Sequence, residues 1–267
     1  MGSGLGAGGT RGARRGRADE DGRVEADPLL PAVERAFELT SRGLTRWDDP
    51  HPPPDRVVAD EEYSRVTDPA KWWIIGARVD AWIDVLVAEG AATVERDVPM
   101  EWDEPPGPIV TSTDLVRPSV ADGLPLVVGR SRIDTVDDAG IVIAVGLPAM
   151  AVCAIPDCGC DACDSGSRDV IEQVDIWLGG VVRGELRHLA RPRSTITVIS
   201  DIVRQASYQP ELPTAGDGWW SAAPPPVERV AAFVSGRARR PHRPFEIDAV
   251  LADPTGWREW SGPPWMS

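Results

Sequence analysis

The hydrophobic period of this sequence changes near residue 91, and that change constrains the fold more than any other feature. Before it, apolar side chains recur at i, i+3, i+4 and i+7, as on one face of an α-helix. The members of this stripe are Trp72, Ile75, Val79, Trp82, Ile83, Leu86 and Val87. After it, residues 91–155 alternate with a period close to two and are rich in β-branched side chains. Strands that follow one another without intervening helices favour antiparallel pairing, so we expect an α+β fold around an antiparallel sheet.

About five strands are expected in this sheet. They are Ala92–Val98, Thr111–Pro118, Leu124–Val136, Ile141–Leu147 and Ala149–Ile155. The turn-forming residues Asp137 to Gly140 separate two of them. Two further strands, at residues 184–189 and 194–199, are expected after the last helix.

Three helices are expected beside these strands. The first begins at Asp27-Pro28, because Asp is a good N-cap and Pro suits a first helical turn. The second covers residues 69–89 and carries the apolar stripe described above. The third covers residues 167–182, with Ser167 as its cap and Gly184 as its stop. The second and third are the two main amphipathic helices that we expect to pack on the sheet.

Composition divides the chain into three parts. Residues 1–27 are rich in Gly and Arg, then acidic, and have almost nothing to bury, so we expect a disordered tail. Residues 28–210 form the expected α+β core domain. Residues 211–267 hold nine Pro and five Gly, but also five of the 11 Trp. These are Trp219, Trp220, Trp257, Trp260 and Trp265. Because disordered tails rarely carry so much aromatic surface, we expect an irregular Pro- and Trp-rich arm that packs on the core and buries some of these rings.

The charge of the chain disfavours two classes of partner. The formal net charge is −14, and residues 1–27 and 211–267 contribute 0 and −1 of it. The central residues 28–210 therefore carry −13. A body that negative repels a phosphate backbone and an anionic lipid surface, so general nucleic-acid binding and membrane docking are disfavoured. A protein partner remains open.

The expected location is the cytoplasm. No apolar run approaches the roughly 18 residues that a membrane span needs. Arg14-Arg15 suggests a twin-arginine signal, but acidic residues 19–21 follow where such a signal needs an apolar stretch. In a reducing compartment, thiols and metal ligands are favoured over disulfides.

All four cysteines fall within eleven residues, between an expected strand and an expected helix. Their spacing is C-x4-C-x-C-x2-C, from Cys153 through Cys158 and Cys160 to Cys163. One interpretation is a metal site built from these four thiolates, with zinc as the candidate ion, because Zn²⁺ takes four ligands in a tetrahedron. If Cys153 points into the core from its strand, the fourth ligand is remote, and His188 or an aspartate is the candidate.

Two other interpretations of the cysteines stay open. Cys160 and Cys163 form a C-x-x-C before a helix, where a helix N-terminus lowers the pKa of a thiol and favours redox chemistry. Nearby aspartates oppose that effect and would favour a cation instead. These are Asp157, Asp161 and Asp164. In the third interpretation the thiols are structural and fill a tight turn that packs the helix on the sheet.

The cysteine block carries a resemblance to a known family. The block Pro156-Asp-Cys-Gly-Cys-Asp-Ala-Cys-Asp164, with the helix that follows, resembles the hallmark of an uncharacterised bacterial domain-of-unknown-function family. The segment Tyr63-Ser-Arg-Val-Thr-Asp-Pro69 and the Trp-ending C-terminus are similar to that family as well. The resemblance covers about residues 28–267 and implies a soluble bacterial protein. It carries over no activity and no catalytic residue, and Cys153 lies outside its block.

Other polar residues form no complete catalytic motif, and no catalytic or cofactor-binding residue is assigned. Asp80 and Asp84 are interpreted as a solvated helix face rather than an acid–base pair. A basic group is expected to lie against the acidic body of the protein. Its members are Arg237, Arg239, Arg240, His242 and Arg243. We therefore expect a non-enzymatic binding or interaction module with a structural or metal-stabilised cysteine turn. The alternative is a metal- or thiol-dependent enzyme centred on the three cysteines of the turn, which are Cys158, Cys160 and Cys163.

Overall fold

The computed structural model describes residues 28–52, 57–192, 194–200, 202–208 and 247–266. The helices in this part of the chain are α1 (Leu30–Thr40), η1 (Asp60–Ser64), η2 (Pro69–Trp72), α2 (Trp73–Ala88), η3 (Asp161–Cys163), α3 (Ser167–Val182) and α5 (Ile247–Ala252). The strands are β1 (Ala92–Glu95), β2 (Val110–Pro118), β3 (Leu126–Ile133), β4 (Val136–Val145), β5 (Met150–Ile155), β6 (Leu186–Arg191), β7 (Ser194–Ile199), β8 (Val203–Tyr208) and β9 (Arg258–Trp260). No helix among the described residues is both long and apolar enough to span a bilayer.

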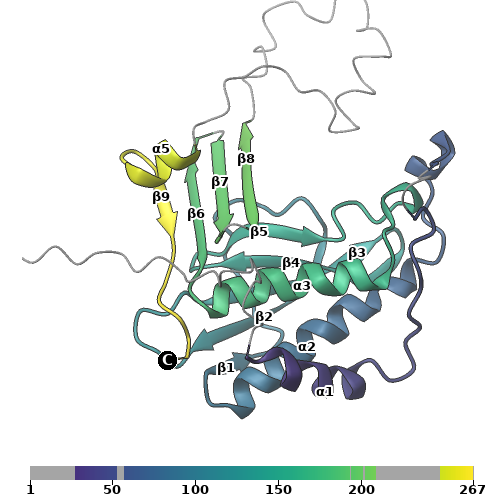
Figure 1. Cartoon of the computed structure of the whole chain (residues 1–267), viewed down its shortest axis with the longest axis horizontal. Coiled ribbons are helices and arrows are strands. Elements are labelled where there is room, and N and C mark those ends of the chain that lie inside the picture. The colour runs from purple at the N-terminus through teal and green to yellow at the C-terminus, as the bar shows by residue number, and fades with distance from the viewer. Residues whose placement is uncertain (1–27, 53–56, 193, 201, 209–246, 267) are drawn as a thin grey trace, which may run out of the picture.

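The first sheet is a meander of five strands in the order β1-β2-β3-β4-β5, and every neighbouring pair is antiparallel (Figure 1). Strands β3 and β4 pair with Val128 opposite Ile143, so both side chains face the same side of the sheet and are fully buried. This arrangement confirms the predicted α+β fold with an antiparallel sheet of five strands.

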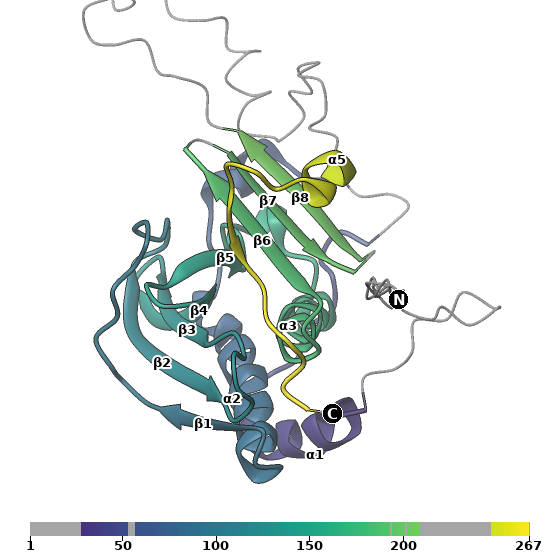
Figure 2. The same ribbon diagram turned by 90° about the vertical axis from the view of Figure 1, so that its left-hand side faces the viewer.

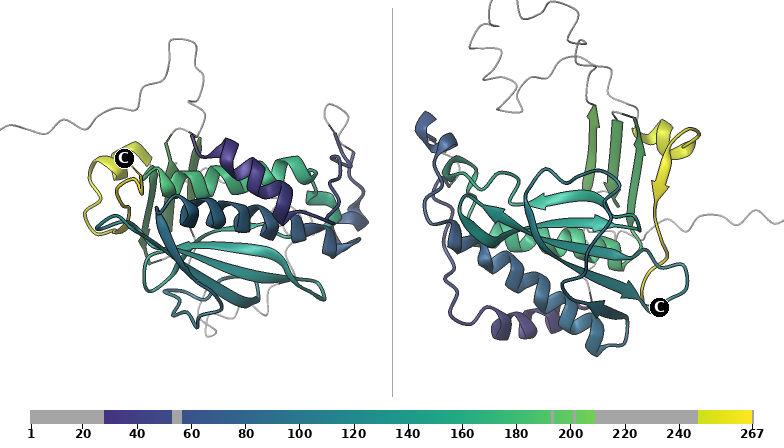
Figure 3. Two further views of the ribbon diagram at one scale, coloured as in Figure 1. Left: turned by 90° about the horizontal axis from the view of Figure 1, so that it is seen from below. Right: turned by 180° about the vertical axis from the view of Figure 1, so that it is seen from behind.

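Helices α2 and α3 lie on one face of this sheet, and α1 packs on their far side (Figure 3). Helix α2 is buried nearly all round, and both Trp82 within it and Trp72 at its N-cap are almost completely inaccessible. The apolar stripe therefore belongs to a central helix that contacts the sheet, α1 and α3 at once. Burial of large aromatic side chains of this kind dominates the stability of a core.

Two predicted helix starts are wrong in detail. Helix α1 begins at Leu30 with Leu29 at the N-cap, and Pro31 rather than Pro28 lies in its first turn. Helix α3 covers the predicted residues, but its N-cap is Gly166 with a φ of 86°, and Ser167 makes no capping bond. The hydroxyl of Ser167 is bound elsewhere, which explains the difference below. Asp27 lies outside the described residues.

The predicted turn at Asp137 to Gly140 is also wrong, because these residues belong to β4. The hairpin turns at Asp134 and Thr135 instead. Gly140 pairs with Ser131 beside a register shift, and a Cβ on Gly140 would lie 2.8 Å from the Ser131 Oγ. The glycine is therefore needed for close packing within the ladder rather than for a turn.

A second antiparallel sheet, with the order β8-β7-β6-β9, stands beyond the C-terminal end of α3 (Figures 1 and 2). Strands β6 and β7 lie within one residue or two of their predicted positions, but the sequence patterns did not indicate a separate sheet. Its last strand, β9, comes from the C-terminal segment and pairs Trp260 with His188 on β6.

The described C-terminal residues 247–266 fold back onto the core (Figure 2). The Trp265 amide donates a 2.8 Å hydrogen bond to the Val182 carbonyl, and the Trp265 ring is buried at the end of α3. The prediction that some tryptophan rings of this region are buried is thus confirmed for Trp265. Trp219, Trp220 and the predicted basic group at 237–243 lie outside the described residues, and the division into three parts stays a prediction.

Candidate metal centre

Three of the four cysteines converge on the turn between β5 and α3, which we call the cysteine turn (residues 156–164). The Sγ atoms of Cys158, Cys160 and Cys163 all lie within 4.8 Å of one another, and those of Cys158 and Cys160 are 3.2 Å apart. The chain reverses at Gly159, which has a φ of 73°. A Cβ on Gly159 would meet the Ile133 Cγ2 at 2.9 Å, so both conformation and space call for glycine here.

The three thiols differ in burial. Cys160 is buried, whereas Cys158 and Cys163 are exposed. Small thiols that merely fill a core would all be inaccessible. The cluster instead has a buried base and an open side that faces solvent, so an ion could reach it.

Cys153 lies outside this cluster. It belongs to β5, opposite Ile143 on β4, and it is half-buried against the main core. Burial, with a smaller contribution from the charge of Asp157, raises the pKa of the Cys153 thiol to about 12. The structure therefore brings together three of the four predicted ligands and keeps Cys153 apart on the ladder.

The surroundings raise the pKa of two of the clustered thiols, those of Cys158 and Cys163. Burial, and then the hydrogen bonds and charges of the other two thiols, raise the pKa of Cys163 to about 12. Burial also raises the pKa of Cys158. Thiols in such surroundings are poor nucleophiles, because the thiolate is the reactive form. A bound cation would remove the mutual repulsion and release the protons.

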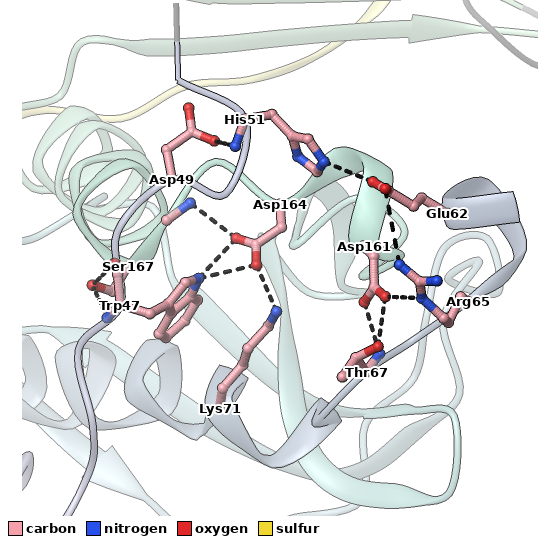
Figure 4. Close-up of polar contacts among 11 residues, drawn as sticks. Trp47, Asp49, His51, Glu62, Arg65, Thr67, Lys71, Asp161, Asp164 and Ser167 are labelled. Atoms are coloured by element: carbon pink, nitrogen blue, oxygen red, sulfur yellow. Dashed lines mark hydrogen bonds and ion pairs between the residues drawn. The ribbon is translucent and has the colours of Figure 1, made fainter. Parts of the chain in front are cut away.

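The carboxylate of Asp161 fixes one side of the cysteine turn. It accepts a 2.6 Å bond from Arg65 Nε, and it also accepts bonds from the Thr67 amide at 2.7 Å and the Thr67 hydroxyl at 2.6 Å (Figure 4). The Asp161 amide in turn donates to the Arg65 carbonyl at 2.9 Å. Burial alone would raise the pKa of Asp161, but the bonds from Arg65 and Thr67 lower it to about 2.

The carboxylate of Asp164 fixes the other side. It is almost fully buried and accepts a 2.5 Å bond from Lys71 Nζ and a 2.8 Å bond from Trp47 Nε1 (Figure 4). It also accepts a 2.9 Å bond from the Gly166 amide. The hydroxyl of Ser167 donates to the Trp47 carbonyl at 2.9 Å, which is why it does not cap α3. We call these two groups of contacts the aspartate locks: Asp161 with Arg65 and Thr67, and Asp164 with Lys71, Trp47 and the Gly166 amide.

The aspartate locks change the role expected for the aspartates. Asp161 and Asp164 were expected to add negative charge for a cation, but both are paired with basic side chains, while Asp157 is exposed. Their partners Arg65 and Lys71 were missed by sequence reasoning. The sequence offered a hint only for Lys71, which is the only lysine of the chain.

The two described histidines are bound away from the thiols. The proposed remote ligand His188 lies on β6, where its Nδ1 is 2.8 Å from the Thr197 hydroxyl and its ring contacts Trp260. His51 Nε2 lies 2.6 Å from a Glu62 carboxylate oxygen. Among the described residues, the three thiols are the complete set of metal-ligating groups that lie within 4.8 Å of one another.

A second polar cluster, the helix–sheet ion cluster, joins α2 to the sheet. Arg130 donates bonds to Asp80 at 2.7 Å and to Asp114 at 3.2 Å, and Arg96 donates to the same two carboxylates at 2.9 and 2.7 Å. Arg130 approaches α2 at Gly76, where a Cβ would lie 3.0 Å from its Nη1. The predicted solvated face is thus wrong for Asp80, which is ion-paired and partly buried.

The fold and the site define an α+β protein with an accessible cluster of three thiols immediately before a helix. The chain belongs to the family of unknown function DUF6226, whose sequence model matches residues 33–264. Searches of curated proteins and of solved structures found no match. The expected membership of a domain-of-unknown-function family is confirmed at that level. The cysteine block as the family's hallmark, and a bacterial origin, stay predictions.

Proposed function

We propose that this chain is a non-enzymatic binding module whose cysteine turn is stabilised by one zinc ion held by Cys158, Cys160 and Cys163. The observation that carries the proposal is the convergence of these three Sγ atoms within 4.8 Å. Three thiolates around zinc, with Zn–S bonds of about 2.3 Å, lie about 3.8 Å apart in a tetrahedron. The thiols need only small shifts to reach that spacing.

The donor chemistry supports a soft ion. Soft thiolate ligands favour zinc or copper(I), whereas magnesium and calcium prefer carboxylate, carbonyl and water oxygens. The cytoplasm, which we propose as the location, keeps thiols reduced and available as ligands. The aspartate locks support the same proposal, because they hold the backbone of the turn on both sides of Cys163 before any ion binds.

The two alternatives have less support. A thiol-dependent enzyme needs a thiol with a lowered pKa, and the pKa values of Cys158 and Cys163 are raised. A purely structural turn leaves two exposed thiols without a packing role. Among the described residues, the contacts of His51 and His188 lead to Glu62 and Thr197, so neither histidine activates a cysteine.

Elemental analysis of the freshly purified, untagged full chain tests the proposal. We expect about one zinc ion per chain in the wild type and in Cys153→Ser, which is the matched control because its thiol lies outside the cluster. Cys160→Ser should lose the ion while keeping the circular-dichroism spectrum of a folded protein. An absent ion in the wild type, or equal metal content in Cys160→Ser, would overturn the proposal.

A further inference from the structure

The proposed zinc site has one donor fewer than a closed structural site. Structural zinc sites use four protein ligands, whereas sites with three protein ligands keep the fourth position for another molecule. Within the described part of the chain, the cluster supplies three sulfur atoms and no nitrogen or oxygen donor. The carboxylates nearest in sequence, Asp161 and Asp164, are bound by Arg65 and Lys71.

Burial indicates which side of the site is open. Cys160 lies at the buried base, and Cys158 and Cys163 flank the exposed side. The position not taken by sulfur therefore faces solvent, where another molecule can approach. The carboxylates of Asp161 and Asp164 point toward Arg65 and Lys71 (Figure 4), and neither belongs to the group of metal-ligating atoms around the thiols.

Charge indicates which donor suits the open position. A divalent ion with three thiolates carries a net charge of −1, and the exposed Asp157, which precedes Cys158 in the sequence, adds a negative charge to the cysteine turn. A fourth anionic ligand would increase this repulsion. A neutral donor adds none, and neutral imidazole is a common ligand of zinc alongside thiolates.

We propose that the open position binds an imidazole nitrogen from a histidine of a partner protein, with water in that place when the partner is absent. The inference rests on the proposed function and makes the metal the contact point of the binding module. It would give the module a chemical preference for partners that expose a histidine.

The test uses the full chain loaded with Co²⁺, which shares the tetrahedral geometry of Zn²⁺ and has visible absorption bands that report on its ligands. Imidazole is the probe. We expect a saturable shift of these bands in the wild type and in Cys153→Ser, with tighter binding of imidazole than of β-mercaptoethanol. His242→Ala should behave as the wild type does; His242 lies outside the described residues.

Three results would overturn the inference while leaving the proposed function intact. One is a cobalt–thiolate spectrum that excess imidazole does not change, which would mean a closed site. Another is tighter binding of β-mercaptoethanol than of imidazole, which would mean that the donor class is wrong. The third is an imidazole response that appears only in His242→Ala, because the fourth ligand would then come from the chain itself. Failure of the wild type to bind cobalt through sulfur would instead count against the proposed function.

Discussion

The cysteine turn and the helix–sheet ion cluster are two polar clusters of the same protein. They differ in whether every member has a partner of opposite charge within the protein. In the ion cluster, two arginines and two aspartates neutralise one another between α2 and the sheet. In the cysteine turn, Asp161 and Asp164 are paired with basic side chains, while the three Sγ atoms converge within 4.8 Å of one another. Burial and then the two neighbouring thiols raise the pKa of Cys163, whereas in the ion cluster every carboxylate has an arginine as its partner.

This difference separates a structural role from a binding role. Buried charges that are fully paired hold elements together and need nothing from outside. Donors that converge on one point, with one side open to solvent, are the arrangement that a metal ion requires. The predictions below test this contrast, from the largest expected effect to the smallest.

Replacing a carboxylate of the ion cluster should have the largest effect on stability. The Asp114 side chain is only 5% exposed and pairs with both Arg96 and Arg130, so Asp114→Ala leaves the two arginines to share Asp80. The substitution removes two charge-assisted hydrogen bonds, each worth about 1.5–3 kcal/mol, so we expect a loss of about 3–5 kcal/mol in the free energy of unfolding, measured by urea titration. The loss should be the same with and without a chelator.

The control for this prediction is an exposed ion pair in the same sheet. Glu95→Ala breaks the pair with Arg117, in which both side chains are about half exposed, and should cost less than about 1 kcal/mol. If Asp114→Ala costs no more than Glu95→Ala, the ion cluster does not hold α2 on the sheet.

Acid should destabilise the protein through His188, a buried neutral group that belongs to neither cluster. Burial lowers its pKa in the folded state to about 4, from an ordinary value of 6.5. The folded state then binds fewer protons than the unfolded state, so this contribution is complete above pH 6.5 and is lost as the pH falls toward 4. The loss is at most about 3 kcal/mol.

The variant His188→Gln removes this titration and keeps a side chain that can bond to Thr197. Urea titrations at several pH values should give a flatter profile between pH 6.5 and 4 than for the wild type. Identical profiles for the two proteins would show that His188 is not held neutral by the fold.

Removal of metal should destabilise only proteins with an intact thiol cluster. At a free zinc concentration 100-fold above the dissociation constant, binding adds about 2.7 kcal/mol to the free energy of unfolding, and a chelator removes it. We expect this change in the wild type and in Cys153→Ser but not in Cys160→Ser. An equal response in Cys153→Ser and Cys160→Ser, measured by thermal unfolding with and without chelator, would contradict the assignment of ligands.

Breaking an aspartate lock should have the smallest effect on stability. Asp161→Asn loses the charge-assisted bond from Arg65, weakens the two bonds from Thr67 and should cost about 1–2 kcal/mol. Because the lock orients the turn, zinc affinity should fall about 10- to 100-fold. Asp157→Asn, at an exposed neighbouring position, is the control and should change neither quantity. A larger fall in affinity for Asp157→Asn would mean that charge rather than orientation is decisive.

Local patterns predicted much of the fold. Helix α3 has the predicted bounds, because an amphipathic stripe and Gly184 mark it within one stretch of sequence. Strands β6 and β7 of the second sheet form a local hairpin and were predicted as strands, whereas its edge strand β9 was not, since it has three residues and pairs Trp260 with His188 far away in the chain. The β4 turn was misplaced because a strand can hold turn-forming residues at an irregular register.

The candidate site divides in the same way. The short spacing in the sequence was enough to predict that Cys158, Cys160 and Cys163 lie together. The alternation of buried and exposed positions expected in β5 suggested that Cys153 points elsewhere. The aspartate locks could not be predicted, because each joins residues about a hundred positions apart. The segment from Tyr63 to Pro69 resembles the family, but its pattern does not indicate that Arg65 and Thr67 bind the cysteine turn.

X-ray absorption at the zinc edge of the metal-loaded full chain tests the central claim most directly, because it counts the atoms bound to the ion. The account predicts three sulfur atoms at about 2.3 Å and one lighter nitrogen or oxygen atom at about 2.0–2.1 Å. Loss of a sulfur atom in Cys158→Ser, but not in Cys153→Ser, should accompany that result. A shell of four sulfur atoms, or one without sulfur, would contradict it.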